Sequence, residues 1–281
     1  MRSTSLQIPK RRFHLVVIAT LSFLSAGSAE AATVAQWNFN SVPSDTLTTT
    51  GTLTPSLDLV PGVPLITNVG NPVPTGQTNP NAAFFNATTI STISLPLDNS
   101  SDPATSDDSS FGIRYTPLNG TLNKTAGIQI QFSTIGLTGV GLTYDQKTAR
   151  FASRYWQVQY SLNGSDFTDF GAVYEPLAVA RFQVNVTGSV GVSYNQWNNG
   201  KSVSFGSLLD NQPTAFVRIV AAFDPNTGNT YAGNLGNDGD ASVYNATNVT
   251  QFDMVTVAIP EPASFALIGA SMLLLARRRR A

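Results

Sequence analysis

Apolar and polar residues alternate along several segments in the middle of the chain. A repeat of two places apolar side chains on one face of a β-strand, so each alternating segment is predicted to be a half-buried strand. The alternating segments are Ala35–Phe39, Ile128–Phe132, Trp156–Tyr160 and Phe182–Val186. The more continuous run Phe216–Val220 predicts a more buried strand, and Phe252–Val257 predicts the strand that closes the domain.

Turn-forming residues separate these segments. Asn-Gly pairs stand at 119–120, 163–164 and 199–200, and Asp224–Gly228 is a further turn signal. The residues at 161–167 predict the tip of a hairpin. Many short strands joined by such turns predict an all-β domain, a β-sandwich or jelly roll.

The predicted β-domain covers residues 32–258, and two stretches within it lack a strand pattern. Val42–Asn81 is rich in Thr, Pro and Gly and is predicted to be a long loop or irregular excursion. Asn99–Ser110 contains Asp102, Asp107 and Asp108 and is predicted to be a second, polar loop.

The N-terminal residues have the layout of a secretory signal peptide. The basic cluster Lys10-Arg11-Arg12 precedes the short apolar run Phe13–Leu24, which ends in small residues. A basic region, an apolar region and an A-x-A site direct export, here through the Sec translocon. Ala29 and Ala31 fit that site, so residues 1–31 are predicted to be removed before Ala32; a cut between Ser28 and Ala29 is the alternative.

The C-terminus, residues 259–281, combines three features. Pro260, Glu261 and Pro262 precede an apolar run of fourteen residues, and four arginines follow it: Arg277, Arg278, Arg279 and Arg280. A membrane-spanning helix needs about twenty apolar residues, and arginines stay on the cytoplasmic side. Because the two prolines keep the tripeptide extended, a protease can reach it. The tail therefore predicts a short helix that enters the membrane transiently.

These three features resemble the PEP-CTERM sorting domain. The resemblance implies recognition by an exosortase, a transpeptidase-like membrane protease, with cleavage near Pro260-Glu261-Pro262. It also implies a Gram-negative bacterium that makes exopolysaccharide, with the protein at the cell surface, in the outer envelope or in the extracellular matrix.

The body itself resembles exported PEP-CTERM proteins that have one jelly-roll-like domain. The segments that carry this resemblance are Ala35–Phe39, Arg154–Ser161 and Phe252–Val257. Because the first and last strands are both strongly patterned, we expect them to pair in one sheet, as in carbohydrate-binding jelly rolls.

The exported body is acidic, although the whole chain has a formal net charge of only −1. Between Ala32 and Pro262, eight basic residues stand against fourteen Asp and two Glu, a net charge of −8. Nucleic-acid binding relies on clustered Lys and Arg, so no nucleic-acid partner is expected.

The mature protein lacks the residues that several kinds of catalysis need. Its only histidine, His14, lies in the signal peptide, and the chain has no cysteine. A Ser-His-Asp triad, a Cys nucleophile and a zinc site of His or Cys are therefore excluded. A glycosidase needs two opposed carboxyl groups, but Asp166 and Asp169 are expected to be solvated turn residues. We therefore expect no enzymatic activity.

Two kinds of ligand remain compatible with the composition. Calcium binds oxygen ligands alone and would be structural; two loops offer such ligands through Asp224, Asn226, Asp238 and Asp240, although turns use the same residue types. Sugars would contact exposed aromatic rings. Trp197 stands among polar residues and is expected to be exposed, with Tyr194 and Tyr231 as further candidates, whereas Trp37 and Trp156 are expected in the core.

Together these features predict an exported surface or exopolysaccharide-matrix protein with a structural or carbohydrate-interacting β-domain. Two alternatives remain open: a secreted carbohydrate-active enzyme that uses carboxylates only, and a permanently membrane-anchored adhesin. A cleft that holds two Asp carboxyls within about 5–10 Å would favour the enzyme, and a flat face with an exposed tryptophan would favour binding.

Overall fold

The described part of the computed structural model has fourteen strands and no helix, which confirms the predicted all-β fold. The described residues are 31–45, 47, 49–70, 82–87, 99–103, 107–114, 116–149, 151–176, 183–186, 189–192, 197–234 and 243–260. Among these residues no helix is long and apolar enough to cross a membrane.

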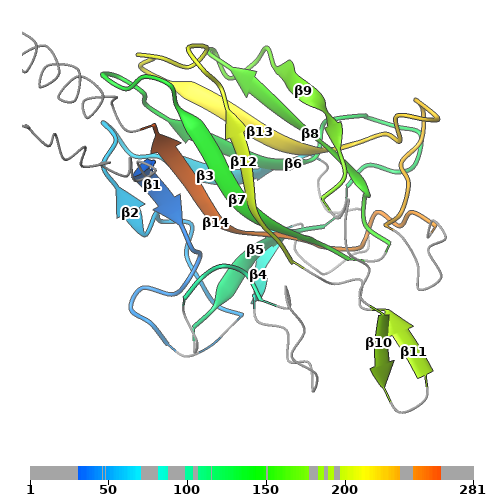
Figure 1. The fold of residues 1–281 in the computed structure, drawn as a ribbon. Coiled ribbons are helices and arrows are strands. Elements are labelled where there is room, and N and C mark those ends of the chain that lie inside the picture. Colours follow the sequence, from blue (N-terminus) through cyan, green and yellow to red (C-terminus); the bar gives the residue numbers. More distant parts are fainter. Residues whose placement is uncertain are drawn as a thin grey trace, which may run out of the picture.

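The larger sheet has seven strands. They are β1 (Ala32–Trp37), β2 (Leu57–Asp58), β4 (Ala82–Asn86), β5 (Ser109–Ile113), β7 (Gly141–Thr148), β12 (Trp197–Ser204) and β14 (Thr250–Ile259). The main order is β12-β7-β14-β1-β2, so the last strand of the domain is central (Figure 1). On the side away from β7, β14 pairs first with β5 and then with β1, and β4 extends β5.

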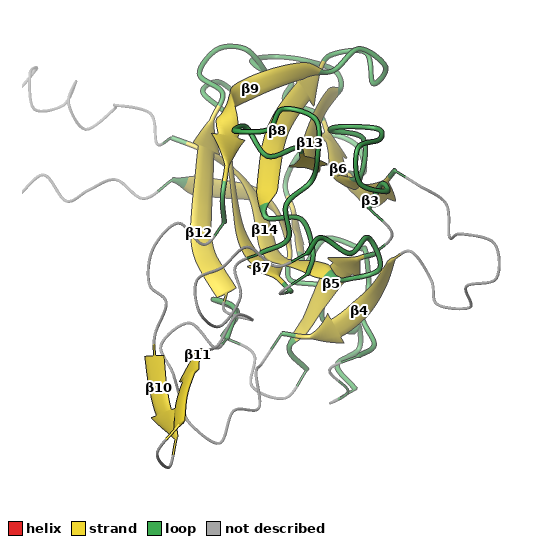
Figure 2. Ribbon diagram, turned by 90° about the vertical axis from the view of Figure 1, so that its right-hand side faces the viewer, coloured by secondary structure: helices red, strands yellow, loops and turns green. Residues whose placement is uncertain are grey.

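A second sheet of five antiparallel strands packs against the first (Figure 2). Its strands are β3 (Leu65–Val69), β6 (Gly127–Phe132), β8 (Tyr155–Ser161), β9 (Thr168–Tyr174) and β13 (Ala215–Ala222), in the order β3-β6-β13-β8-β9. A separate ribbon pairs β10 (Gln183–Val186) with β11 (Ser189–Val192). The arrangement is a sandwich of two antiparallel sheets.

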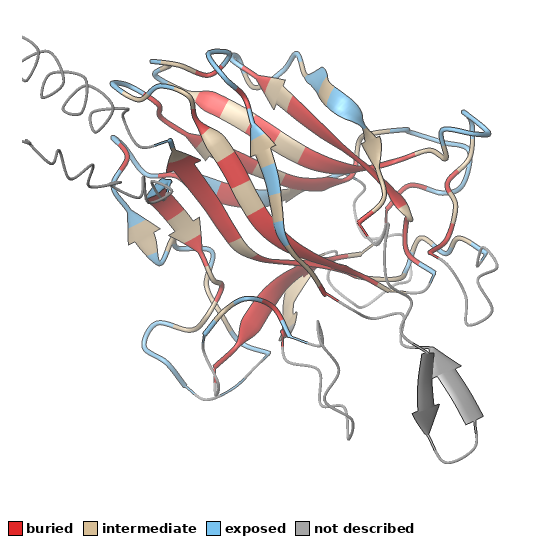
Figure 3. Cartoon of the chain, viewed as in Figure 1, coloured by how far each residue is buried: buried red, intermediate tan, exposed pale blue. Residues whose placement is uncertain are grey.

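Alternating apolar side chains from both sheets fill the space between them. Trp156 on β8 packs edge-on against Phe252 on β14, with ring centroids 5.6 Å apart, and both side chains are completely buried. Figure 3 shows long buried stretches along β8 in the smaller sheet and along β5 and β14 in the larger one. Apolar burial of this kind is the main stabilising term of the domain, at roughly 25 cal/mol for each Å² removed from water.

Several predicted local features are confirmed. β1 pairs with β14 from Ala32 opposite Ile259, so the first and last strands do share a sheet. The hairpin tip at 161–167 joins β8 to β9, and the side-chain oxygen of Asn163 accepts hydrogen bonds from the backbone N–H groups of Ser165 and Asp166, both at 2.9 Å. The turn that begins at Asp224 closes with a 2.7 Å hydrogen bond from the Gly228 N–H.

Other expectations are wrong. Asn199-Gly200 does not join two strands: the pair lies inside β12, at a shift in its register with β7. Val42–Asn81 contains β2 and also β3, which forms the edge of the smaller sheet. The predicted polar loop Asn99–Ser110 ends in a strand, because Ser109 and Ser110 begin β5, and Asp107 and Asp108 just before it are buried.

Candidate functional site

Trp197 is not a surface residue. It begins β12, its side chain is completely buried, and its Nε1 donates a 2.7 Å hydrogen bond to the carbonyl oxygen of Ala87. The ammonium group of Lys147 lies 5.6 Å from the centre of its ring. The prediction that Trp197 is exposed to a ligand is wrong, because its ring is buried in the fold and its N–H is bound to the chain at Ala87, far away in the sequence.

Tyr231 is buried as well, with 3% of its surface exposed. Its hydroxyl donates a 3.0 Å hydrogen bond to the carbonyl oxygen of Leu122, and its ring stacks on that of Tyr244 with centroids 4.9 Å apart. Tyr231 therefore supports a neighbouring aromatic ring instead of offering its own face to a ligand. The third aromatic candidate, Tyr194, lies outside the described residues.

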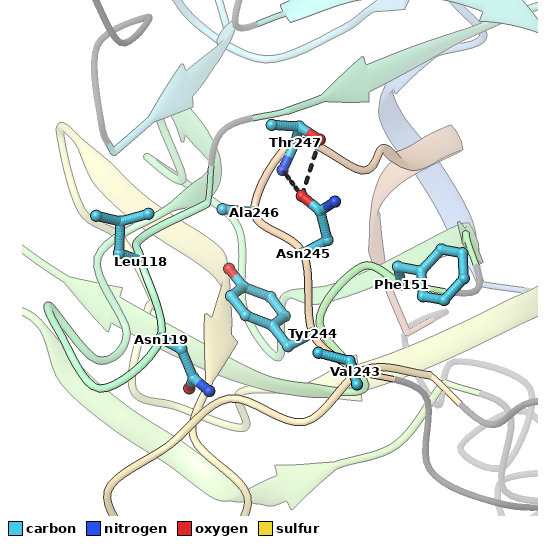
Figure 4. A pocket seen from close by; sticks show the side chains of 8 residues that line it. All are labelled: Leu118, Asn119, Phe151, Val243, Tyr244, Asn245, Ala246 and Thr247. Carbon is cyan, nitrogen blue, oxygen red and sulfur yellow. Dashed lines mark hydrogen bonds between the residues drawn. The ribbon is translucent and has the colours of Figure 1, made fainter.

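An open pocket of about 500 Å³ lies beside Tyr244 (Figure 4). Its lining residues are Leu118, Asn119, Phe151, Val243, Tyr244, Asn245, Ala246 and Thr247. The lining is mostly apolar, and Phe151 has 39% of its surface exposed. Apolar and aromatic walls with a few amide groups suit a ligand that has both apolar faces and hydroxyl groups.

Hydrogen bonds hold the walls of this pocket in place. The hydroxyl of Tyr244 donates a 2.7 Å hydrogen bond to the carbonyl oxygen of Pro117, and burial raises the pKa of Tyr244 to about 12, so this donor stays protonated. The side-chain oxygen of Asn245 accepts from the backbone N–H and hydroxyl of Thr247 (Figure 4). These bonds fix Tyr244, Asn245 and Thr247 in the pocket wall.

A second cavity, of about 330 Å³, lies between the edges of the two sheets. The hydroxyls of Tyr144 and Tyr174 are 2.6 Å apart there, and the Lys201 ammonium group lies 5.1 Å from the centre of the Tyr174 ring. Burial raises the pKa of both tyrosines and lowers that of Lys201. A tyrosine that acts as a base needs the opposite shift, so this pair is better suited to closing the sandwich than to proton transfer.

Five aspartates gather where β7 and β14 meet the chain at 99–103 and 107–108. Asp102, Asp107, Asp108, Asp145 and Asp253 are called the aspartate cluster below. Carboxylate oxygens of Asp102, Asp108 and Asp253 all lie within 4.8 Å of one another. Asp145 stands directly opposite Asp253 in the β7–β14 ladder, where like charges destabilise a sheet.

The aspartate cluster is unevenly supplied with hydrogen bonds. Asp145 accepts from the Ser101 hydroxyl at 2.6 Å and from the Gly200 N–H at 2.7 Å. In contrast, one buried carboxylate oxygen each of Asp107, Asp108 and Asp253 accepts none. An unsatisfied buried acceptor costs about 1–3 kcal/mol, and more if it is charged.

Burial and neighbouring charge also oppose ionisation in the cluster. Burial, together with the charges of Asp102, Asp107 and Asp145, raises the pKa of Asp108 to about 7. Burial raises the pKa of Asp253 well above its usual value, and the charges of Asp102 and Asp108 add to the effect. The cluster thus favours either bound protons or a bound cation.

Sequence reasoning missed this cluster and placed its calcium ligands elsewhere. At Asp224, one carboxylate oxygen accepts from the backbone N–H and the side-chain amide of Asn226, at 2.8 and 2.9 Å, so this loop is an internally satisfied turn. Asp238 and Asp240 lie outside the described residues. The available signal was Asp253, a carboxylate set between Phe252 and Met254 in an apolar strand.

The two predicted processing positions lie side by side. β1 begins at Ala32 opposite Ile259, and Ala31 and Pro260 line the same small cavity. β14 ends at Ile259, so the sorting motif follows the sandwich without a linker. The remaining residues of these predictions, Ala29, Glu261, Pro262, Arg277, Arg278, Arg279 and Arg280, lie outside the described part of the chain.

Comparison with known proteins identifies the tail. Residues 258–280 match the family model of the PEP-CTERM protein-sorting motif. No curated protein matches the chain.

Similar solved structures include the K1 and K3 cleaved adhesin domains of Lys-gingipain from Porphyromonas gingivalis W83. The K1 domain is 15% identical, with 70% of this chain and 98% of that chain covered and a TM-score of 0.34. For the K3 domain the values are 14%, 58%, 81% and 0.27. Values this low assign neither a ligand nor a partner to this chain.

Fold and tail together define the class of protein. It is an exported protein in which a β-domain of two antiparallel sheets leads directly into a motif that exosortase processes. Proteins with this PEP-CTERM motif are exported to the cell surface.

Proposed function

We propose that the protein is a non-enzymatic component of the cell surface or the exopolysaccharide matrix of a Gram-negative bacterium. The observation that carries the proposal is the direct continuation of β14 into the sorting motif: the central strand of the larger sheet ends at Ile259, next to Pro260. The β-sandwich is therefore the part of the protein that the C-terminal motif sorts to the surface.

The distribution of carboxylates supports a non-enzymatic role. None of the three cavities described above is lined by Asp or Glu. The carboxylates of Asp102, Asp108 and Asp253 are close together, but Asp108 and Asp253 are buried, and a glycosidic bond cannot come between them. A carboxylate-only glycosidase remains the alternative, and it would release new reducing ends from a polysaccharide.

We further propose that the pocket beside Tyr244 contacts sugar. Trp197 and Tyr231 are buried and cannot form the predicted sugar contact. The pocket instead offers the partly exposed ring of Phe151. Sugar rings pack their C–H faces on such rings while amides hydrogen-bond their hydroxyls.

Mass spectrometry of the protein from envelope and medium tests the sorting step. We expect a mature chain that begins at Ala32 and lacks Arg277–Arg280. An intact arginine tail in the mature protein would refute processing and favour a permanently anchored adhesin.

Binding of the full chain to its own exopolysaccharide tests the sugar contact. Phe151→Ala should weaken binding about fivefold to tenfold, as expected for the loss of one aromatic contact. Leu162→Ala is the matched control, because Leu162 is similarly exposed, at 47%, but lies at the β8–β9 hairpin tip. Equal binding by both variants and the wild type would exclude this pocket as the sugar-binding site. Release of reducing ends from the polysaccharide by the protein would favour the glycosidase alternative.

A further inference from the structure

We propose that the aspartate cluster binds one Ca²⁺ ion between β14 and the segments 99–103 and 107–108. Asp102, Asp108 and Asp253 hold the ion. The proposal concerns a different site from the sugar pocket and does not depend on the function proposed above.

The geometry of the carboxylates fits one shared ion. Two oxygens bound to one Ca²⁺ at 2.3–2.6 Å are at most about 5 Å apart. The oxygens of Asp102, Asp108 and Asp253 lie within 4.8 Å of one another. They come from two separate parts of the chain, and β14 presents Asp253 from a strand whose register with β7 shifts just after this residue.

A second observation points to a ligand. Asp108 and Asp253 are 1% and 0% exposed, and each has a buried carboxylate oxygen that accepts no hydrogen bond. These are strong acceptors, and leaving them without a partner is costly. A cation would satisfy both oxygens and would also neutralise the repulsion between Asp253 and Asp145 across the ladder.

The donor set favours calcium over other metals. The cluster offers oxygen atoms alone, which excludes a zinc site of His or Cys. The Ser100 hydroxyl, 3.5 Å from Asp108, is a neutral oxygen beside the three carboxylates. Mg²⁺ is smaller and keeps several of its waters, whereas a site with buried carboxylates requires an ion that loses them readily.

The ion would link the segments that carry Asp102 and Asp108 to β14, the central strand of the larger sheet, through Asp253. That strand also continues into the sorting motif. Extracellular calcium modules bind with dissociation constants of about 10⁻⁴ to 10⁻³ M, so we expect an affinity in that range.

Calorimetric titration and thermal unfolding of the full chain, freed of metal with EDTA, test the site. We expect one Ca²⁺ to bind per chain, and saturating CaCl₂ to raise the unfolding temperature by about 5–10 °C. MgCl₂ at the same concentration should have a much smaller effect. No binding and no change in unfolding temperature up to about 10 mM CaCl₂ would overturn the proposal.

Variants locate the ion. Asp253→Asn and Asp108→Asn should abolish calcium binding, yet in EDTA each should unfold at the same temperature as the wild type or higher, because a repelling carboxylate is gone. Asp224→Asn is the matched control at the calcium loop predicted from the sequence, and it should respond to calcium as the wild type does. Calcium binding that survives in both cluster variants, or that is lost in Asp224→Asn, would refute this site. If Asp253→Asn fails to fold, Asp108→Asn decides.

Discussion

All three tryptophans bury their rings and donate their indole N–H to a backbone carbonyl. Trp37 donates to Leu53 at 3.1 Å, Trp156 to Ser153 at 2.9 Å and Trp197 to Ala87 at 2.7 Å. A large apolar ring with one satisfied polar atom is suited to a buried position. At the scale of the residue, the expected core positions of Trp37 and Trp156 are therefore confirmed, and Trp197 joins them.

Trp197→Ala should lower the free energy of unfolding by about 3–5 kcal/mol, because it removes a buried aromatic ring and leaves a cavity. It also leaves the Ala87 carbonyl without its donor. Urea denaturation measures the change. The exposed control Leu162→Ala should cost less than about 0.5 kcal/mol. A similar loss for both variants would contradict the burial of Trp197.

Asp169 gives a pH prediction. Burial raises its pKa, but hydrogen bonds from Lys124 and Gln159 outweigh this, so its pKa is lower than usual. Its contribution to stability is therefore present above the unfolded-state pKa of about 3.9 and is lost as the pH falls through the folded-state value. Asp169→Asn should cost less than about 1 kcal/mol at pH 7, since the pair is partly exposed, and less again at pH 2. Denaturation at both pH values measures this, and an equal cost at the two would contradict it.

At the scale of the element, strands are held by close backbone approach as well as by side chains. Gly127 on β6 pairs with Val220 on β13, and a Cβ atom at Gly127 would lie 1.9 Å from the carbonyl oxygen of Ile219. Gly171 on β9 differs: its φ is +69°, but nothing lies within 4 Å of a Cβ atom built there.

The two glycines predict different costs for the same substitution. Gly127→Ala should destabilise the domain by more than about 3 kcal/mol, because β6 and β13 must move apart. Gly171→Ala should cost only about 1–2 kcal/mol, the strain of a left-handed residue with a Cβ atom. Thermal and urea unfolding of both variants measure the difference. The reverse order would contradict the β6–β13 pairing.

At the scale of the whole molecule, β14 joins the parts of the larger sheet. It pairs with β1, β5 and β7, and its Phe252 packs on Trp156 of the smaller sheet. A chain that ends before Thr250 should therefore fail to fold. A chain that ends after Pro260 lacks the sorting tail and should fold as the full chain does. Circular dichroism and limited proteolysis distinguish the two outcomes, and a folded chain without β14 would contradict this topology.

The sequence by itself determined the local features. A period of two in apolar residues, as in Ile128–Phe132 and Trp156–Tyr160, predicts strands because adjacent side chains of a strand point to opposite faces. The hairpin tip at 161–167 was also predictable, because Asn and Gly accept the backbone angles of tight turns. The sorting motif at 258–280 was predictable for a similar reason: its recognition depends on contiguous residues.

Only the tertiary structure decided what distant segments build together. Asp108 comes close to Asp253 because β5, which follows Asp108 directly, pairs with β14, and Asp102 joins them from the preceding segment; no spacing along the chain encodes that meeting. The polar neighbours of Trp197 suggested exposure, yet its ring is completely buried and its N–H is bound to the carbonyl of Ala87. β2 was missed because it has only two residues, and β3 because it directly follows Pro64 in a segment rich in Thr, Pro and Gly; pairing with β1 and β6 defines them as strands. Burial and charge proximity are properties of the folded chain, because they depend on contacts between residues that are far apart in the sequence.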